Sequence, residues 1–247
     1  MKRLFIVLAL LFSDSLPAQA PVAVPVGKEP RHRLVFENEY VRVFRVSIPA
    51  HDATLLHQHD LPYVYVSIGP ADFINAVAGK PEAHVVMTDG QVGYSRGGFA
   101  HIARTDAGIP FENLTIELLK PQGDPKNICA QVLFGVPEAD CPKSGTALGG
   151  AHKKPLFETG NTFVDLVALG PSLNLLSIVP PQGSLIVFLG DTQIRTGSID
   201  APVEKVMKGD VIWVLAGTHE LIWNSRGKDL SYLEVSFSSS EPLVKRH

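Results

Sequence analysis

Short runs of apolar, β-branched and aromatic residues recur along the chain, each bounded by Gly, Pro, Asp or Asn. The clearest runs lie at residues 40–46, 63–68, 114–119, 184–189, 211–215 and 230–237. Such runs between turn residues are typical of β-strands. No segment keeps a 3.6-residue apolar period over three turns, so the pattern does not predict long amphipathic helices. It predicts an all-β chain folded as a sandwich or a barrel.

Composition agrees with a folded, turn-rich chain of 247 residues. Hydrophobic residues make up 45% and charged residues 19%, which excludes disorder for most of the chain, and there are 21 Gly and 19 Pro. The formal net charge is −3. Without a basic surplus to neutralise phosphates, we expect no nucleic-acid binding.

The first twenty residues have the pattern of a signal peptide. Lys2 and Arg3 precede an apolar stretch at 4–12, and Ala18-Gln19-Ala20 offers a cleavage site. The stretch is too short to span a bilayer. We therefore expect residues 1–20 to be a signal peptide and the mature protein to be periplasmic or secreted, with no membrane contact after cleavage.

The only two cysteines, Cys129 and Cys141, lie in a Pro-containing stretch that has the character of a loop. In an oxidising compartment a disulfide between them is the favoured interpretation. Two unpaired thiols stay the alternative, because connectivity cannot be read from a sequence.

A weak internal repeat divides the chain. Residues 36–38 (Phe-Glu-Asn) resemble residues 157–159 (Phe-Glu-Thr), and residues 90–101 resemble residues 209–219. In the terminal strands Glu117 aligns with Glu234. Three matches in the same order indicate a duplicated unit.

Histidines concentrate in the first unit. His57 and His59 are two residues apart, a spacing that places both side chains on one face of a strand. With a third imidazole from a distant strand they would form a facial metal site that leaves positions open for substrate. Imidazoles that line a barrel without metal are the alternative.

The surroundings of the pair resemble the first motif of the cupin superfamily, which is glycine, five residues, H-x-H, three or four residues, glutamate, six residues and glycine. Here His57 and His59 provide H-x-H, and the stretch runs on to Gly69. Ala50 stands in the place of the first glycine, and Tyr63 replaces the glutamate.

A stretch similar to the second cupin motif follows. That motif is glycine, five residues, P-x-G, two residues, histidine, three residues and asparagine. Gly90, Gly98 and His101 match in spacing, whereas Arg96 and Thr105 replace the proline and the asparagine. The resemblance covers about residues 34–120.

The resemblance implies a jelly-roll barrel with His57, His59 and His101 as ligands of a divalent ion (Fe, Mn, Ni, Cu or Zn), without the carboxylate ligand. Three neutral ligands leave the full +2 charge of the ion, which favours anionic partners. We expect Tyr63 to point inward, where it donates a hydrogen bond, acts as an acid or packs in the wall. Arg96 would meet an anionic substrate or lie exposed in a turn.

The second unit lacks H-x-H and keeps only remnants of the motifs, Gly209-Asp210, Gly217 and His219. It resembles a degenerate cupin. The whole chain therefore resembles a bicupin, with two tandem cupin-like double-stranded β-helix (jelly-roll) barrels. The expected division is a cupin domain with the metal site at 30–122, a linker with the cysteine pair at 123–152 and the degenerate domain at 153–240.

Two functions stay open on these grounds. The first is a metal-dependent cupin oxidoreductase or isomerase, with dioxygenases and isomerases both allowed by the resemblance. The second is a non-catalytic bicupin that binds a sugar or another small ligand, or a structural exported protein. We expect the partner to be a small molecule, a substrate in the first case and a ligand in the second. Both functions are compatible with a homodimer.

Overall fold

The computed structural model describes residues 22–142, 146–148, 151–170, 174–178, 182–195, 200, 202–217, 219–223 and 229–238. In this part of the chain every regular element except the 3₁₀ turn η1 (Val26–Lys28) is a β-strand. The all-β prediction is therefore confirmed. The expected signal peptide at 1–20 lies outside the described residues. No helix among the described residues is long and apolar enough to cross a membrane.

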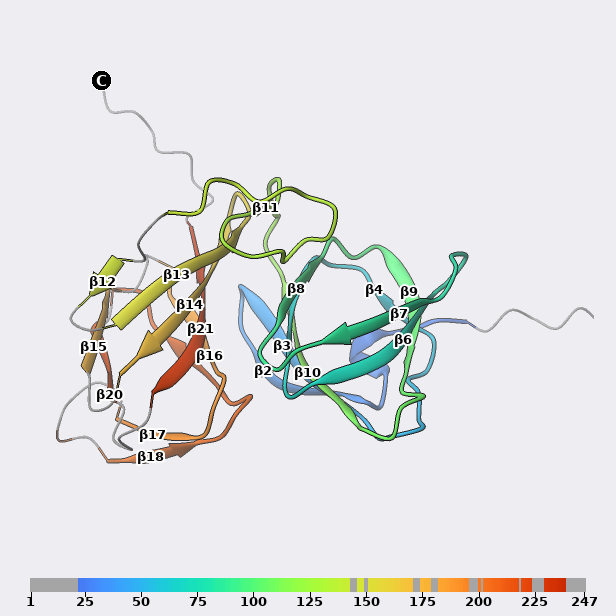
Figure 1. Cartoon of the computed structure of the whole chain (residues 1–247), viewed down its shortest axis with the longest axis horizontal. Coiled ribbons are helices and arrows are strands. Elements are labelled where there is room, and N and C mark those ends of the chain that lie inside the picture. The colour runs from blue at the N-terminus through green and yellow to red at the C-terminus, as the bar shows by residue number, and fades with distance from the viewer. Residues whose placement is uncertain are drawn as a thin grey trace, which may run out of the picture.

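The N-terminal half forms the first barrel, coloured blue to green in Figure 1. Its two five-stranded sheets have the orders β1-β4-β9-β6-β7 and β2-β3-β10-β5-β8. The strands are β1 (Val24–Pro25), β2 (His32–Glu37), β3 (Val41–Ile48), β4 (His57–His59), β5 (Tyr63–Ser67), β6 (Ala71–Val77), β7 (Ala83–Met87), β8 (Val92–Ser95), β9 (Phe99–Arg104) and β10 (Phe111–Leu118).

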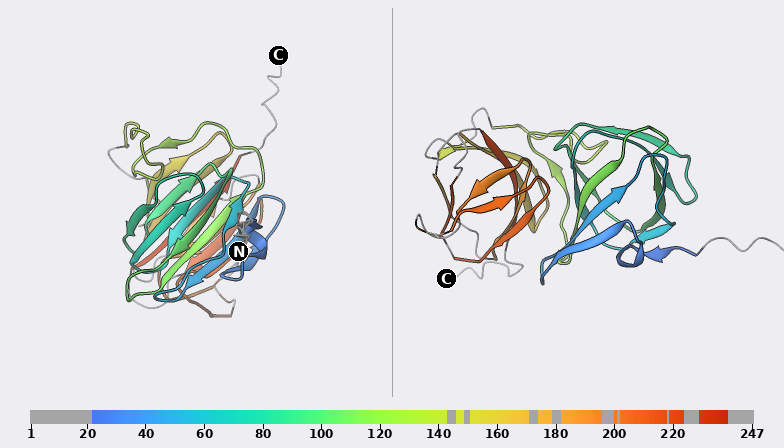
Figure 2. Two further views of the ribbon diagram at one scale, coloured as in Figure 1. Left: turned by 90° about the vertical axis from the view of Figure 1, so that its right-hand side faces the viewer. Right: turned by 90° about the horizontal axis from the view of Figure 1, so that it is seen from below.

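The C-terminal half forms the second barrel, which lies beside the first in Figures 1 and 2. Its main sheet has the order β11-β13-β14-β21-β16-β19, with β12 paired to β13, and β15-β20 and β17-β18 form two further pairs. The strands are β11 (Lys126–Asn127), β12 (Thr146–Leu148), β13 (Ala151–Glu158), β14 (Thr162–Leu169), β15 (Asn174–Ile178), β16 (Ser184–Phe188), β17 (Thr192–Ile194), β18 (Glu204–Val206), β19 (Val211–Val214), β20 (His219–Trp223) and β21 (Leu230–Phe237).

A buried asparagine organises the connection between the barrels. The Nδ2 of Asn127 donates to the carbonyls of Leu133 and Val136, and its Oδ1 accepts from the backbone N–H groups of Val132 and Leu133. A disulfide joins Cys129 to Cys141 in the same loop. The structure therefore contains the disulfide that was the favoured interpretation of the cysteine pair.

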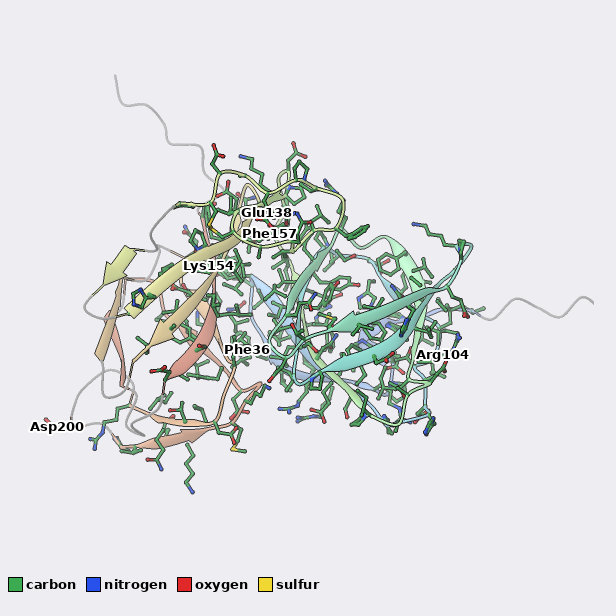
Figure 3. The ribbon with its side chains drawn as sticks, viewed as in Figure 1. Phe36, Arg104, Glu138, Lys154, Phe157 and Asp200 are labelled. Carbon is green, nitrogen blue, oxygen red and sulfur yellow. A yellow bond between two sulfur atoms is a disulfide. The ribbon has the colours of Figure 1, made fainter. Side chains whose placement is uncertain are left out.

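The largest apolar core lies between the two barrels. Alternate side chains of β10, among them Leu114 and Ile116, point out of the first barrel and pack in one cluster with Leu233 and Val235 of β21. Figure 3 labels two aromatic side chains near this boundary, Phe36 of the first barrel and Phe157 of the second. β10 and β21 are largely buried on both faces, but polar residues such as Thr115 and Glu234 alternate with the apolar residues that face the other barrel.

The two barrels repeat the same strand pairings. The β3–β10 ladder ends with Val41 opposite Leu118, and the β14–β21 ladder ends with Thr162 opposite Phe237. The neighbouring pairs β2–β3 and β13–β14 both carry a register shift at the equivalent point, just before Phe36 and Phe157. Matching ladders support duplication of one unit.

The register corrects one detail of the predicted repeat. Glu117, one place from the ladder end, corresponds to Ser236, and Glu234 corresponds to Thr115. The sequence alignment of Glu117 with Glu234 was wrong by two residues. A shift of two keeps the inward and outward faces of a strand, so the hydrophobic pattern could not detect it.

Candidate metal centre

Strand β4 presents the two histidines of the H-x-H pair to the barrel interior. His57 and His59 are both buried, whereas Gln58 between them is only partly buried. Strand β9 runs antiparallel to β4 and places His101 directly opposite His57. The ring of His101 lies 4.4 Å from that of His57 and 5.1 Å from that of His59, centroid to centroid. The three predicted ligands thus come together.

The turn before β4 corrects the reading of the first motif. His51, not Ala50, adopts a left-handed backbone conformation, with a φ of 59°. Glycine enters this region at no steric cost, whereas other residues seldom do. His51 therefore takes the place of the motif's first glycine, one residue later than the alignment put it.

A fourth imidazole, which the sequence analysis did not single out, joins the cluster. His32 of β2 is buried, and its ring centroid lies 4.6 Å from that of His57. The ligand nitrogens of His32, His57 and His59 all lie within 4.8 Å of one another, so these three residues form a group that could hold a metal ion. His101 is not part of that group, but its ring lies beside that of His57, and all four imidazoles line one cavity.

Three of the four rings are anchored through Nδ1 to an oxygen acceptor. The partners are the backbone carbonyl of Leu55 at 2.9 Å for His57, the amide oxygen of Asn75 at 2.7 Å for His101 and the carboxylate of Glu29 at 2.7 Å for His32. An acceptor at Nδ1 requires the proton there, so each Nε2 carries a free lone pair. Such outer partners orient metal-binding histidines in other proteins.

Burial keeps His57, His59 and His101 neutral. Together with the neighbouring imidazoles, it lowers the pKa of His57 to about 4, that of His59 to about 2 and that of His101 to about 3. At neutral pH none of these three residues carries a proton on both nitrogens. Neutral imidazole is the form that binds metal ions.

The donor atoms fit a divalent ion. The Nε2 atoms of His57 and His59 are 3.1 Å apart, and the Nε2 of His101 is buried without a hydrogen-bond partner. Buried polar atoms normally have partners, so the unpartnered Nε2 of His101 needs an explanation, and so does the unpartnered Nδ1 of His59. A cation bound between the Nε2 atoms of His57, His59 and His101 would give the His101 nitrogen its partner, as in sites built from several histidines.

The carboxylate of Glu29 contacts the imidazole cluster directly, through its hydrogen bond with His32. Burial raises its pKa, but the hydrogen bonds from His32 and from the backbone N–H groups of Leu55 and Arg31 outweigh that effect, and the pKa is lowered. The carboxylate is therefore ionised behind His32. It offsets part of any positive charge held by the imidazoles.

Tyr63 reaches the same space, and Arg96 does not. The ring of Tyr63 stacks on His59 with 4.5 Å between centroids, and its phenol shares a hydrogen bond with Ser95. Burial raises the pKa of Tyr63, so the phenol stays protonated. Arg96 is exposed, and it is not among the residues that line the cavity. The structure thus groups Tyr63 with the histidines, and the catalytic roles of Tyr63 and Arg96 stay predictions.

A cavity of about 240 Å³ opens beside the histidines. Its wall is largely aromatic and includes Tyr65, Phe73 and Phe111. Tyr65 lies flat over Gly93 of the neighbouring strand, where a Cβ would meet the Tyr65 ring at 2.1 Å. The cavity and the imidazoles together form a candidate site for a metal ion and a small ligand.

The sequence matches no family model, and no curated protein is significantly similar to it. Solved structures do match its fold. AerE from Microcystis aeruginosa matches over 85% of this chain and 99% of its own, with a TM-score of 0.57 and 8% identity. Salicylate 1,2-dioxygenase from Pseudaminobacter salicylatoxidans matches over 86% of this chain and 77% of its own, with a TM-score of 0.59 and 10% identity.

A variant of oxalate decarboxylase from Bacillus subtilis matches over 83% of this chain and 70% of its own, with a TM-score of 0.53 and 12% identity. These matches cover both barrels. The chain has the cupin fold. Matches with identities this low show the fold of the chain alone, so its activity is argued from its own residues.

Proposed function

We propose that this cupin is a metal-dependent enzyme, an oxidoreductase or isomerase, that acts on a small molecule in its first barrel. The observation that carries the proposal is the set of anchored imidazoles. Three Nδ1 atoms face acceptors, and the ligand nitrogens of His32, His57 and His59 lie within 4.8 Å of one another in one buried space. A polar lining without metal would more readily pair those nitrogens with hydroxyl or amide groups.

His57, His59 and His101 would hold the ion, with His32 as a fourth imidazole in place of the missing carboxylate. A bound divalent ion would act as a Lewis acid. A redox-active ion would also exchange electrons with dioxygen in an oxygenase reaction. Tyr63 would keep its proton and donate a hydrogen bond to a ligand beside His59, a role that its stacking on His59 and its raised pKa support. Aromatic side chains, among them Tyr65, Phe73 and Phe111, form much of the wall of this space.

We further propose that the protein works in the periplasm or outside the cell. The charged, apolar and A-x-A segments of residues 1–20 support export. The Cys129–Cys141 disulfide supports it independently, because disulfides persist in oxidising compartments.

The metal content of the purified protein, prepared without a metal-affinity column, tests the proposal. We expect about one equivalent of a divalent transition metal per chain, and less than about a tenth of an equivalent in the His57→Ala/His101→Ala variant. His84→Ala is the matched control, because His84 is exposed and bonds only Asp72 among the contacts that the structure shows. It should retain the metal.

If the protein takes up none of Fe, Mn, Ni, Cu and Zn when it is reconstituted with each ion in turn, the proposal is overturned. The non-catalytic reading would then lead, and the cavity would be tested for sugars and other small ligands by thermal shift. Retention of full metal in the double variant, with an unchanged fold by circular dichroism, would instead move the site away from these histidines.

A further inference from the structure

The chemistry of the cavity wall restricts what binds beside the histidines. Among the described residues, no Lys, Arg, Asp or Glu side chain lines the cavity. The charged groups close to the wall are already engaged, since Glu29 bonds His32 and buried Glu117 pairs with Arg42. A ligand in this space would therefore meet the metal at one end and no countercharge elsewhere.

The wall becomes apolar with distance from the imidazoles. On β6 the inward residue beyond Asn75, which holds His101, is Phe73. On β9 the inward residue beyond His101 is Ala103. Phe73 stacks on Phe111 with 4.3 Å between ring centroids and 18° between planes, and both belong to an apolar cluster with Ala103. The far end of the cavity thus contains an aromatic and aliphatic surface, and the uncharged polar side chains of Ser95, Asn113 and Thr115 also line the cavity.

The size of the cavity sets the size of the ligand. A dry apolar cavity of roughly 150 Å³ accommodates benzene. The cavity here is about 240 Å³, which leaves room for one ring with a few substituents. Aromatic side chains favour a planar ring as their partner.

We propose that the substrate is a single-ring aromatic compound with oxygen donors at the end that faces the histidines and an uncharged opposite end. This inference rests on the proposed metal site, which supplies the partner for the oxygen donors. It excludes compounds whose second anionic group would lie against Phe73 and Phe111, because an unpaired charge there would lose its hydration without compensation.

Two catechols form a matched pair of probes. 4-Methylcatechol and 3,4-dihydroxybenzoate present the same donor oxygens, and they differ in a methyl or a carboxylate at the far end. For the zinc-loaded protein we expect a Kd for 4-methylcatechol at least about 30-fold lower, after correction for the affinities of the two compounds for zinc in buffer. The readouts are calorimetry for the ligands and elemental analysis for zinc on the same sample.

Variants of the wall locate the ligand. Tyr65→Ala removes a ring from the wall and should weaken 4-methylcatechol binding about tenfold, with zinc content unchanged. Tyr65→Phe keeps the ring and is the matched control, with binding close to that of the original chain. Equal losses in the two variants, or no loss in Tyr65→Ala, would overturn the assignment of this cavity.

The outcomes separate the inference from the proposed function. Zinc uptake with equal or tighter binding of the carboxylate compound, or with no binding of either compound, overturns the inference and leaves the metal site standing. Loss of such carboxylate binding in Arg96→Ala would show that this exposed side chain folds inward to supply a countercharge. Absence of zinc uptake overturns both.

Discussion

The two barrels have the same framework and different interiors. In the first, His32 of β2 lies opposite Val46, and in the second the equivalent residue of β13, Lys153, lies opposite Val167. The inward positions of Phe44 and Thr115 are likewise taken by Asp165 and Glu234. One set of positions thus holds an imidazole beside a cavity, and the other set holds an ion-pair network.

The network in the second barrel satisfies itself. The Lys153 ammonium contacts the carboxylates of Asp165 and Glu234 at 3.0 Å each, and Ser184 donates to Glu234 at 3.2 Å. Attraction to both carboxylates raises the pKa of Lys153 although burial opposes it. Unpartnered buried atoms do not separate the barrels, because the first leaves the Nε2 of His101 and the second leaves the hydroxyl of Tyr232 without a hydrogen-bond partner. Neutral imidazoles gathered beside a cavity, rather than unpartnered polar atoms as such, mark the first barrel as a binding site.

Apolar filling separates the barrels as well. The second barrel packs a cluster that includes Ile186, Phe188 and Tyr232 into its interior. The smaller cluster of the first barrel, which includes Phe73 and Phe111, borders the cavity. Among the described residues, duplication therefore produced one barrel filled with apolar side chains and one that is hollow beside its imidazoles, and the filled barrel packs against the outer face of the hollow one.

The largest expected difference between the two barrels is in the loss of stability when one interior phenylalanine is replaced in each. Phe188→Ala should lower the free energy of unfolding by about 3–5 kcal/mol, because Phe188 is fully buried in a close-packed cluster. Phe73→Ala should lower it by roughly half as much, since Phe73 already borders empty space. Urea denaturation followed by circular dichroism measures both changes. Equal losses would contradict the distinction between a filled and a hollow barrel.

His32 and Lys153 occupy equivalent positions in the two barrels, so substituting each in turn tests which barrel binds metal. His32→Gln should weaken zinc binding by about 30-fold while leaving some binding through the remaining imidazoles. Lys153→Gln should leave zinc affinity unchanged, because the network of the second barrel offers no site. Competition with a chromogenic chelator measures both affinities.

Thermal unfolding of the same two variants provides the control. Lys153→Gln leaves two buried carboxylates without their cation and should lower the melting temperature. A lower melting temperature would show that this substitution alters the second barrel even though zinc affinity stays unchanged. An unchanged zinc affinity in His32→Gln would restrict the ligands to His57, His59 and His101 and leave His32 as a neighbour.

The sequence was sufficient for the fold and for most of the cluster. Strand-like runs predicted the all-β architecture, and the spacing of His57, His59 and His101 located three imidazoles that the structure brings together. These predictions succeeded because a two-residue spacing on a strand fixes the face of a side chain. The far partner, His101, came from the resemblance to the second cupin motif.

His32 could not be found in the same way. It stands between Arg31 and Arg33, in a stretch whose neighbours read as exposed, and it precedes both motifs. Its inward direction follows from the β2–β3 register and from the contact with Glu29, and neither is a local property of the sequence. The cavity also escaped prediction, because its volume depends on how Tyr65, Phe73 and Phe111 pack across strands far apart in the chain.

The smallest expected effect concerns the carboxylate behind His32. Glu29→Gln keeps an oxygen acceptor for the Nδ1 of His32 and removes the negative charge, so zinc affinity should fall by about tenfold. Glu234→Gln is the matched control, because it removes the equivalent kind of charge beside Lys153 in the second barrel and should not change zinc affinity. If Glu29→Gln has no effect while His32→Gln weakens binding, His32 acts as a ligand without help from its carboxylate. An equal effect of both glutamine substitutions on zinc would mean that the charge acts over a long range, and the two interiors would then be electrostatically coupled rather than separate.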